Sequence, residues 1–240
     1  MGNGASKKKY DAVVLADATI HSADADGIII PEALVPSPCA GTWEAKKQAV
    51  TLQDWTFAPT STAAAAAASG STRAEAVGFQ QTQRLNPEKY QFTRGAGEAR
   101  EVLATIVCTH RKLGGTTFTV YRTEAAYRGQ KPCDDPTLTK MKEEGPNLYP
   151  YAEISIQGVS SATYCLQTPA GLKEVYKVQK MGMVQFRCVI EQSGGGAVAK
   201  ARQANAIGSK GVVAVGTGCD LMAVCSLVIL LINANQQAGH

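Results

Sequence analysis

The chain has 240 residues, of which 45% are hydrophobic and 18% charged, and its formal net charge is +4. This balance excludes disorder along the whole chain, because such a composition can bury a substantial core. The small charge does not indicate a nucleic-acid partner. Seven cysteines without a C-x-x-C pair and three scattered histidines predict reduced thiols and no metal or cofactor site.

The first nine residues, MGNGASKKK, match the N-myristoylation pattern M-G-x-x-x-[ST]. The acyl group is attached to the α-amine of Gly2, and Ser6 stands at the required position. One acyl chain holds a protein on a bilayer only marginally. Lys7, Lys8 and Lys9 supply a second signal for an anionic leaflet. We therefore predict a myristoylated basic tail on the cytoplasmic face of a eukaryotic membrane, the alternative being a flexible start with an accidental Gly and Ser.

Two segments are predicted to lie outside the core. Residues 10–39 combine scattered acids with three prolines and are interpreted as a flexible tether to a domain that spans 40–235. Residues 60–76 are rich in alanine, with Ser and Gly interruptions and no apolar face, and are interpreted as an insertion in a surface loop.

From about residue 98 onward the hydrophobic pattern has a period of two, which is typical of β-strands. The segments TTFTVYR, YAEISIQ and MVQFRCVI each alternate apolar and polar residues, and glycine-rich or proline-containing turns separate the strands. The predicted inward residues are Phe118, Val120, Ala152, Ile154, Ile156, Val184, Phe186, Cys188 and Ile190. Many short strands with one polar face predict an antiparallel sheet or barrel.

The most apolar stretch runs from Leu221 to Ile232. As a helix it is about 18 Å long at 1.5 Å per residue, well short of the roughly 30 Å hydrocarbon core of a bilayer. Asp220 is the predicted structural cap of this helix, since its carboxylate can accept the free N–H groups of the first turn. We therefore expect a central helix over 220–233, buried inside a barrel. The alternative is a single-pass membrane segment over 212–232.

The final strand followed by VGTGCDLMAVCSLVILLINA resembles the C-terminus of the tubby-like superfamily, and more closely its LURP-one-related and phospholipid scramblase branch. GEAREVLATIVCTHRKLGGTTFTVYR resembles the paired early strands of that family, and GLKEVYKVQKMGMVQFRCVIEQSGGGAVAKARQ its late strand pair. The resemblance implies a mainly β fold, a closed antiparallel β-barrel wrapped around a C-terminal hydrophobic helix. The cysteine-rich palmitoylated segment of scramblases is absent, and acylation at Gly2 would replace that anchor.

These features predict a non-enzymatic, membrane-tethered tubby-like domain that binds anionic phospholipid or a membrane-associated protein. Lys46 and Lys47, or Arg111 and Lys112, are the candidate phosphate-facing patches, with ordinary solvated charges as the alternative. No enzyme activity is expected, because the chain contains neither G-x-S-x-G nor a glycine-rich phosphate loop. The alternative function is a phospholipid scramblase or a single-pass membrane protein that uses the C-terminal helix.

Overall fold

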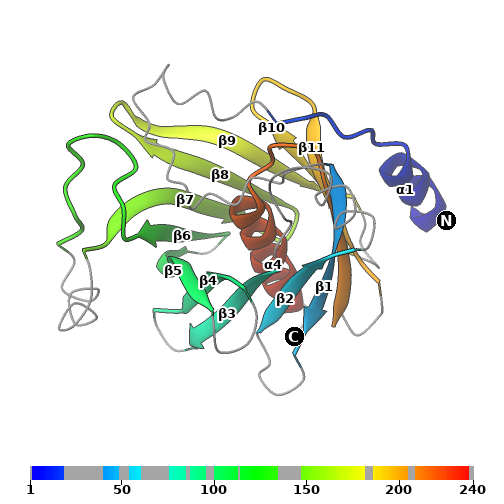
Figure 1. Cartoon of the computed structure of the whole chain (residues 1–240). Helices are drawn as coiled ribbons and strands as arrows, with labels where there is room; N and C mark the ends of the chain where they lie inside the picture. The colour runs from blue at the N-terminus through cyan, green and yellow to red at the C-terminus, as the bar shows by residue number, and fades with distance from the viewer. Residues whose placement is uncertain are drawn as a thin grey trace.

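The computed structural model is a closed antiparallel barrel with a helix inside it (Figure 1). It describes residues 2–18, 40–48, 54–60, 76–84, 87–95, 100–112, 114–134, 147–181, 186–204 and 209–237. The strands are β1 (Gly41–Lys47), β2 (Trp55–Pro59), β3 (Val77–Gln83), β4 (Lys89–Arg94), β5 (Glu101–Lys112), β6 (Gly115–Arg122), β7 (Tyr149–Gln157), β8 (Ser161–Thr168), β9 (Gly171–Lys180), β10 (Arg187–Gln192), β11 (Ala197–Gln203) and β12 (Lys210–Val215). The predicted mainly β, barrel-and-helix fold is confirmed.

The barrel is an up-and-down meander. Each strand pairs with its neighbours in sequence, and β12 pairs with β1 to close the sheet, so no open edge is left among the described strands. Because side chains alternate across a strand, every second residue points into the barrel. The predicted inward residues that the structure describes are all buried: Phe118, Val120, Ala152, Ile154, Ile156, Phe186, Cys188 and Ile190. Val184 lies outside the described residues.

The helix α4 (Leu221–Gln237) fills the barrel interior (Figure 1). Every side chain from Leu221 to Ile232 is buried, which explains why this helix is apolar on all sides. It runs four residues beyond the predicted end at 233. No helix in the described part of the chain is both long and apolar enough to cross a bilayer.

The direction of α4 defines two different barrel ends. Near its start, the amide of Asp220 donates a hydrogen bond to the Tyr176 hydroxyl over 3.1 Å. Near its end, Lys180 Nζ at the close of β9 donates to Asn235 Oδ1 over 2.5 Å. We call the first the N-cap end and the second the C-terminal end of the barrel. Strands β1, β3, β5, β7, β9 and β11 all finish at the C-terminal end, because neighbouring strands are antiparallel.

The N-terminal region was predicted to be a basic tail over 1–9 and a flexible tether over 10–39. In its described part, residues 2–11 form the helix α1 (Gly2–Asp11), and residues 12–18 lie against the barrel. The amide of Ala16 donates to the Ala197 carbonyl over 2.8 Å, and that of Ala18 donates to the Thr217 carbonyl over 2.8 Å. A ten-residue helix is marginal alone, so tertiary contacts that no local pattern records must hold it.

Glycines in the turn before α4 allow this close approach. A Cβ atom at Gly216 would stand 2.1 Å from the Ala16 carbonyl oxygen, a distance that real atoms do not reach. Gly218 has a φ of +74° and lies close to Ala18. The G-x-G spacing is therefore required by the passing N-terminal chain. The rest of the predicted tether, 19–39, and residues 61–75 of the alanine-rich segment lie outside the described residues.

Candidate functional site

The two predicted basic patches lie at the C-terminal end of the barrel, on strands that are not neighbours. Lys46 and Lys47 are the last residues of β1, and Arg111 and Lys112 are the last residues of β5. Strands β2, β3 and β4 separate them in the sheet. The structure therefore presents two separate patches, each with its own surroundings.

The patch on β1 is exposed and faces a second lysine. The Lys46 side chain is 64% exposed and its Nζ lies 3.6 Å from Glu44 Oε2. Directly opposite Lys46 in the β1–β12 register stands Lys210, and both line a hollow of about 240 Å³. Lys47 lies with its ammonium 5.9 Å from the ring centre of Trp55, and burial, followed by the charge of Arg84, lowers its pKa. Two ammonium groups and the Glu44 carboxylate thus border one hollow, which leaves one net positive charge to attract an anion.

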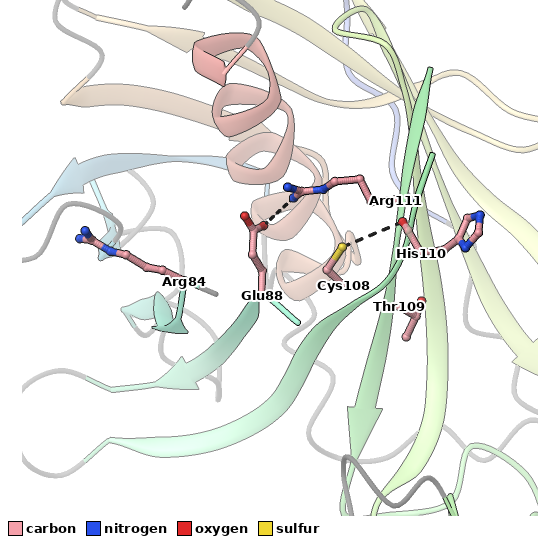
Figure 2. A pocket seen from close by; sticks show the side chains of 6 residues that line it. All are labelled: Arg84, Glu88, Cys108, Thr109, His110 and Arg111. Carbon is pink, nitrogen blue, oxygen red and sulfur yellow. Dashed lines mark hydrogen bonds and ion pairs between the residues drawn. The ribbon is translucent and has the colours of Figure 1, made fainter. Parts of the chain in front are cut away.

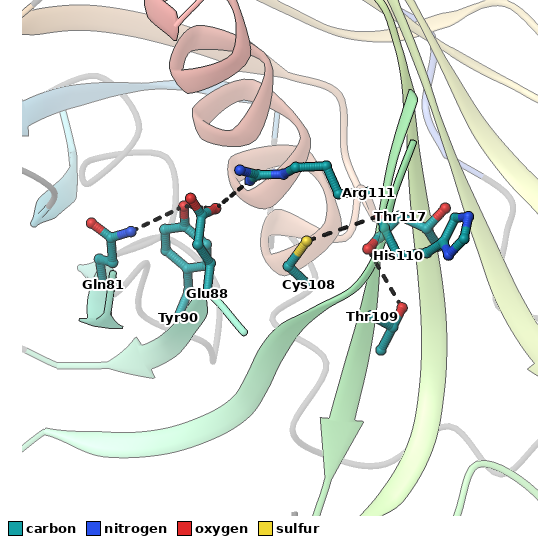
Figure 3. A network of polar contacts seen from close by, with 8 residues as sticks. All are labelled: Gln81, Glu88, Tyr90, Cys108, Thr109, His110, Arg111 and Thr117. Atoms are coloured by element: carbon teal, nitrogen blue, oxygen red, sulfur yellow. Dashed lines mark hydrogen bonds and ion pairs between the residues drawn. The ribbon is translucent and has the colours of Figure 1, made fainter. Parts of the chain in front are cut away.

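The patch on β5 borders a larger pocket of about 390 Å³, whose lining Figure 2 shows. Arg111 points across it and lies 3.1 Å from a carboxylate oxygen of Glu88, whose side chain is only 13% exposed. The same carboxylate accepts a hydrogen bond from the Tyr90 hydroxyl over 3.2 Å, and Gln81 donates to that hydroxyl over 3.4 Å (Figure 3). An ion pair thus offsets the charge of Arg111, which makes this patch a weaker anion site than its sequence indicates. Of Lys112, the structure describes the backbone.

This pocket also holds a cysteine and a histidine, but not as a nucleophile and its base. The Cys108 thiol faces the backbone carbonyl of His110 over 4.0 Å, while the imidazole points away from the sulfur (Figure 2). Burial raises the pKa of Cys108. An activated thiol needs a lowered pKa and a base within hydrogen-bond reach. The geometry of this pair therefore supports no thiol chemistry.

The lipidation motif lies on a helix attached to the outside of the barrel. Gly2 opens α1, and Lys7, Lys8 and Lys9 are exposed on it. Tyr10 is buried against the barrel, with its ring centre 5.3 Å from the ammonium of Lys200 on β11. That ammonium also donates to the backbone carbonyls of Tyr10 and Val13, over 3.5 and 3.0 Å. These contacts hold the helix beside β10 and β11.

At the N-cap end, Asp220 caps α4 from inside the barrel. Its Oδ1 accepts hydrogen bonds from the amides of Met222 at 2.9 Å and Ala223 at 3.2 Å. The residue is 2% exposed, and burial raises the pKa of its carboxyl to about 6, while the two amides and the charge of Arg122 act against that rise. This is the geometry of an N-cap. The predicted cap is therefore observed, and its role is to stabilise the first turn of the helix.

Three cations that sequence reasoning did not select lie on the three strands that follow β1 around the barrel. They are Arg187 on β10, Arg202 on β11 and Lys210 on β12, and these strands and β1 are consecutive in the sheet. The alternating pattern indicated that Arg187 points outward, but no local signal shows which outward residues become neighbours. Strand register, a tertiary property, decides that.

Within the described ranges, no group of three or more His, Cys, Asp or Glu side chains is placed to hold a metal ion. Comparison of the chain with models of protein families, with curated proteins and with solved structures found no match. Residues and geometry therefore carry the functional argument.

Proposed function

We propose that this protein is a non-enzymatic, membrane-tethered binding domain. It is myristoylated at Gly2, lies on the cytoplasmic leaflet of a eukaryotic membrane, and binds anionic phospholipid or a membrane-associated protein. The observation that carries the proposal is the complete acylation motif, with Ser6 in place and three lysines directly after it. The exposure of Lys7, Lys8 and Lys9 on α1 supports it.

The energetics suit a reversible membrane anchor. A single myristoyl chain gives an association constant on the order of 10⁴ M⁻¹, which is too weak for stable attachment. Each lysine near an anionic surface adds about 1 kcal/mol. Because charge is screened within roughly 10 Å at 0.1 M salt, this second contribution weakens as salt rises.

Membership of the tubby-like superfamily, in its LURP-one-related and scramblase-like branch, is part of the proposal. A closed antiparallel barrel around an apolar C-terminal helix is the architecture that the sequence resemblance implies. Since the helix fills the barrel, we place the binding function on the outer surface and the N-terminal helix.

The test is co-sedimentation with anionic vesicles of the chain co-expressed with an N-myristoyltransferase, beside Gly2→Ala, at low and high salt. We expect the acylated protein to bind, the binding to weaken with salt, and Gly2→Ala to lose it. Mass spectrometry of the N-terminal peptide checks that the acyl group is present. If Gly2→Ala stays on the vesicles at high salt, the C-terminal helix inserts and the single-pass or scramblase alternative replaces this proposal.

A further inference from the structure

We propose that one outer face of the barrel lies on an anionic bilayer. This face is formed by α1 and by the parts of β10, β11, β12 and β1 that lie at the C-terminal end of the barrel. This inference rests on the proposed function, and it adds to it the contacting surface and the orientation of the domain. We call this surface the basic face. Its exposed cations are Lys7, Lys8, Lys9, Lys46, Arg202 and Lys210.

The first observation is that like charges stand opposite each other in the sheet. Lys46 pairs with Lys210 across β1 and β12, and Arg187 pairs with Arg202 across β10 and β11. Side chains directly opposite in an antiparallel pair have Cβ atoms about 4.5–5.5 Å apart, and like charges there are destabilising. Of these four residues Lys46, Arg202 and Lys210 are exposed, and they lie at the same barrel end on three strands that are neighbours in the sheet. Exposed cations gathered in this way attract an anionic surface.

Acids on the basic face are few. Glu44 pairs with Lys46, and Asp11 ends α1; against the six exposed cations this leaves 6 − 2 = +4 among the described residues of the face. The whole chain has a net charge of +4, so this one face accounts for a charge as large as that of the entire protein.

The second observation is that the N-terminal helix is fixed on the same face. Burial raises the pKa of the Tyr10 phenol above its ordinary value, and the charges of Arg202 and Arg187 act against that rise, so both guanidinium groups lie near the base of α1. Arg187 and Val189 point outward from β10 yet are buried, which is consistent with α1 packing over them. Figure 1 shows α1 beside β10 and β11 on the outside of the barrel.

Together these contacts link the acyl site to the basic face. The chain from Tyr10 to Ala18 is pinned by Lys200 and by backbone hydrogen bonds to β11 and the turn before α4. The helix that carries Lys7, Lys8 and Lys9 is therefore held beside β10 and β11, whose neighbours in the sheet are β12 and β1. Each cation brought to an anionic surface strengthens binding roughly fivefold, so the face adds substantially to the acyl anchor.

The experiment compares two triple variants of the myristoylated chain that lose equal charge. Lys46→Gln/Arg202→Gln/Lys210→Gln removes cations of the basic face, and Lys131→Gln/Lys173→Gln/Lys177→Gln removes exposed lysines elsewhere. Partitioning is measured on phosphatidylcholine vesicles with and without phosphatidylserine. We expect the first triple to lose on the order of 100-fold in affinity for the serine-containing vesicles. The second triple should stay within a few-fold of wild type, and the vesicles without serine should not distinguish the three proteins.

Lysine acetylation, read by mass spectrometry, gives the orientation independently of affinity. On bound vesicles we expect protection of Lys46 and Lys210, with Lys173 and Lys177 modified as in free protein. Equal affinity loss in both triples, or unprotected Lys46 and Lys210, overturns the inference while wild-type binding leaves the proposed function in place. If acylated wild type and Gly2→Ala bind equally poorly, the proposed function itself fails.

Discussion

The two ends of the barrel differ in how far their charged side chains are exposed. At the N-cap end, the charged side chains of Asp220 and Arg122 are enclosed, both 2% exposed, among the buried tyrosines 151, 164 and 176. There the carboxylate accepts backbone amides, and the guanidinium donates to the Leu103 carbonyl over 3.4 Å. At the C-terminal end, Lys46 and Lys210 are exposed and stand opposite each other across β1 and β12.

This comparison distinguishes charged groups that stabilise the fold from charged groups that can bind a partner. A buried side chain stays charged only where protein dipoles replace the water that would hydrate it. The charged groups at the N-cap end therefore take part in holding the fold together. An exposed cation keeps contact with water, so it can also contact an external anion. Buried, hydrogen-bonded charges therefore mark the N-cap end of this barrel, while exposed cations mark the end that we assign to function.

The largest expected effect is the loss of the buried cation. Arg122→Met removes the donor to Leu103 and the guanidinium that lies 5.2 Å from the Tyr151 ring, and it leaves Asp220 without the nearby positive charge. We expect the free energy of unfolding to fall by about 2–4 kcal/mol, measured by urea denaturation at neutral pH. Glu124→Gln is the control, because its 60% exposed carboxylate pairs with the same arginine and should matter by less than about 1 kcal/mol. Equal losses in both variants would contradict the assignment.

The second effect is a pH dependence that comes from the cap. The pKa of Asp220 is about 6 in the folded protein against 3.8 ordinarily, so folding favours its protonated form. This contribution to stability is fully present below about pH 4 and is lost as pH rises through about 6, by roughly 3 kcal/mol in total. Asp220→Asn keeps the capping oxygen without the titration. We expect the variant to gain stability relative to wild type between pH 4 and pH 7.

Urea denaturation of both proteins at a series of pH values checks this. Glu44→Gln, which removes an exposed carboxylate at the other end, should show a much smaller pH-dependent difference from wild type. A constant difference between wild type and Asp220→Asn across the range would show that the carboxyl is not buried as described.

The smallest expected effect is at the C-terminal end of the barrel, where the interaction between two charged side chains should be repulsive and not attractive. A double-mutant cycle on Lys46→Gln and Lys210→Gln isolates the interaction between the two residues that face each other across β1 and β12. We expect a repulsive coupling of about 0.2–1 kcal/mol at low salt, which falls as salt screens it. The measurement is the unfolding free energy of the four proteins of the cycle. An attractive coupling would mean that these amines are already bridged by an anion or a carboxylate of the protein.

Much of the fold follows from local patterns. The alternation around Phe118, Ile154 and Cys188 predicted strands with one buried face, and these residues are buried. An apolar stretch too short for a bilayer and preceded by Asp220 predicted a buried, capped helix. Period, length and capping are properties of neighbouring residues, so they can be read without knowing the tertiary structure.

The position of the N-terminal region could not be predicted from local patterns. Residues 10–18 have no strong helical or strand pattern, and their position depends on Lys200 and on glycines far away in the sequence. The ion pair of Arg111 could not be predicted for the same reason, because Glu88 lies in a different strand connection and only the folded chain brings it to Arg111. Contacts between distant residues depend on register and strand order.

By itself, the sequence determined that the apolar tail is part of a core and that the N-terminus carries a complete acylation motif, since both depend on composition and spacing along the chain. Only the tertiary structure decided which cations become neighbours. Lys46 and Lys210 are far apart in sequence and meet because the last strand closes the barrel on the first. Barrel closure, a long-range pairing without a local signature, therefore created the basic face.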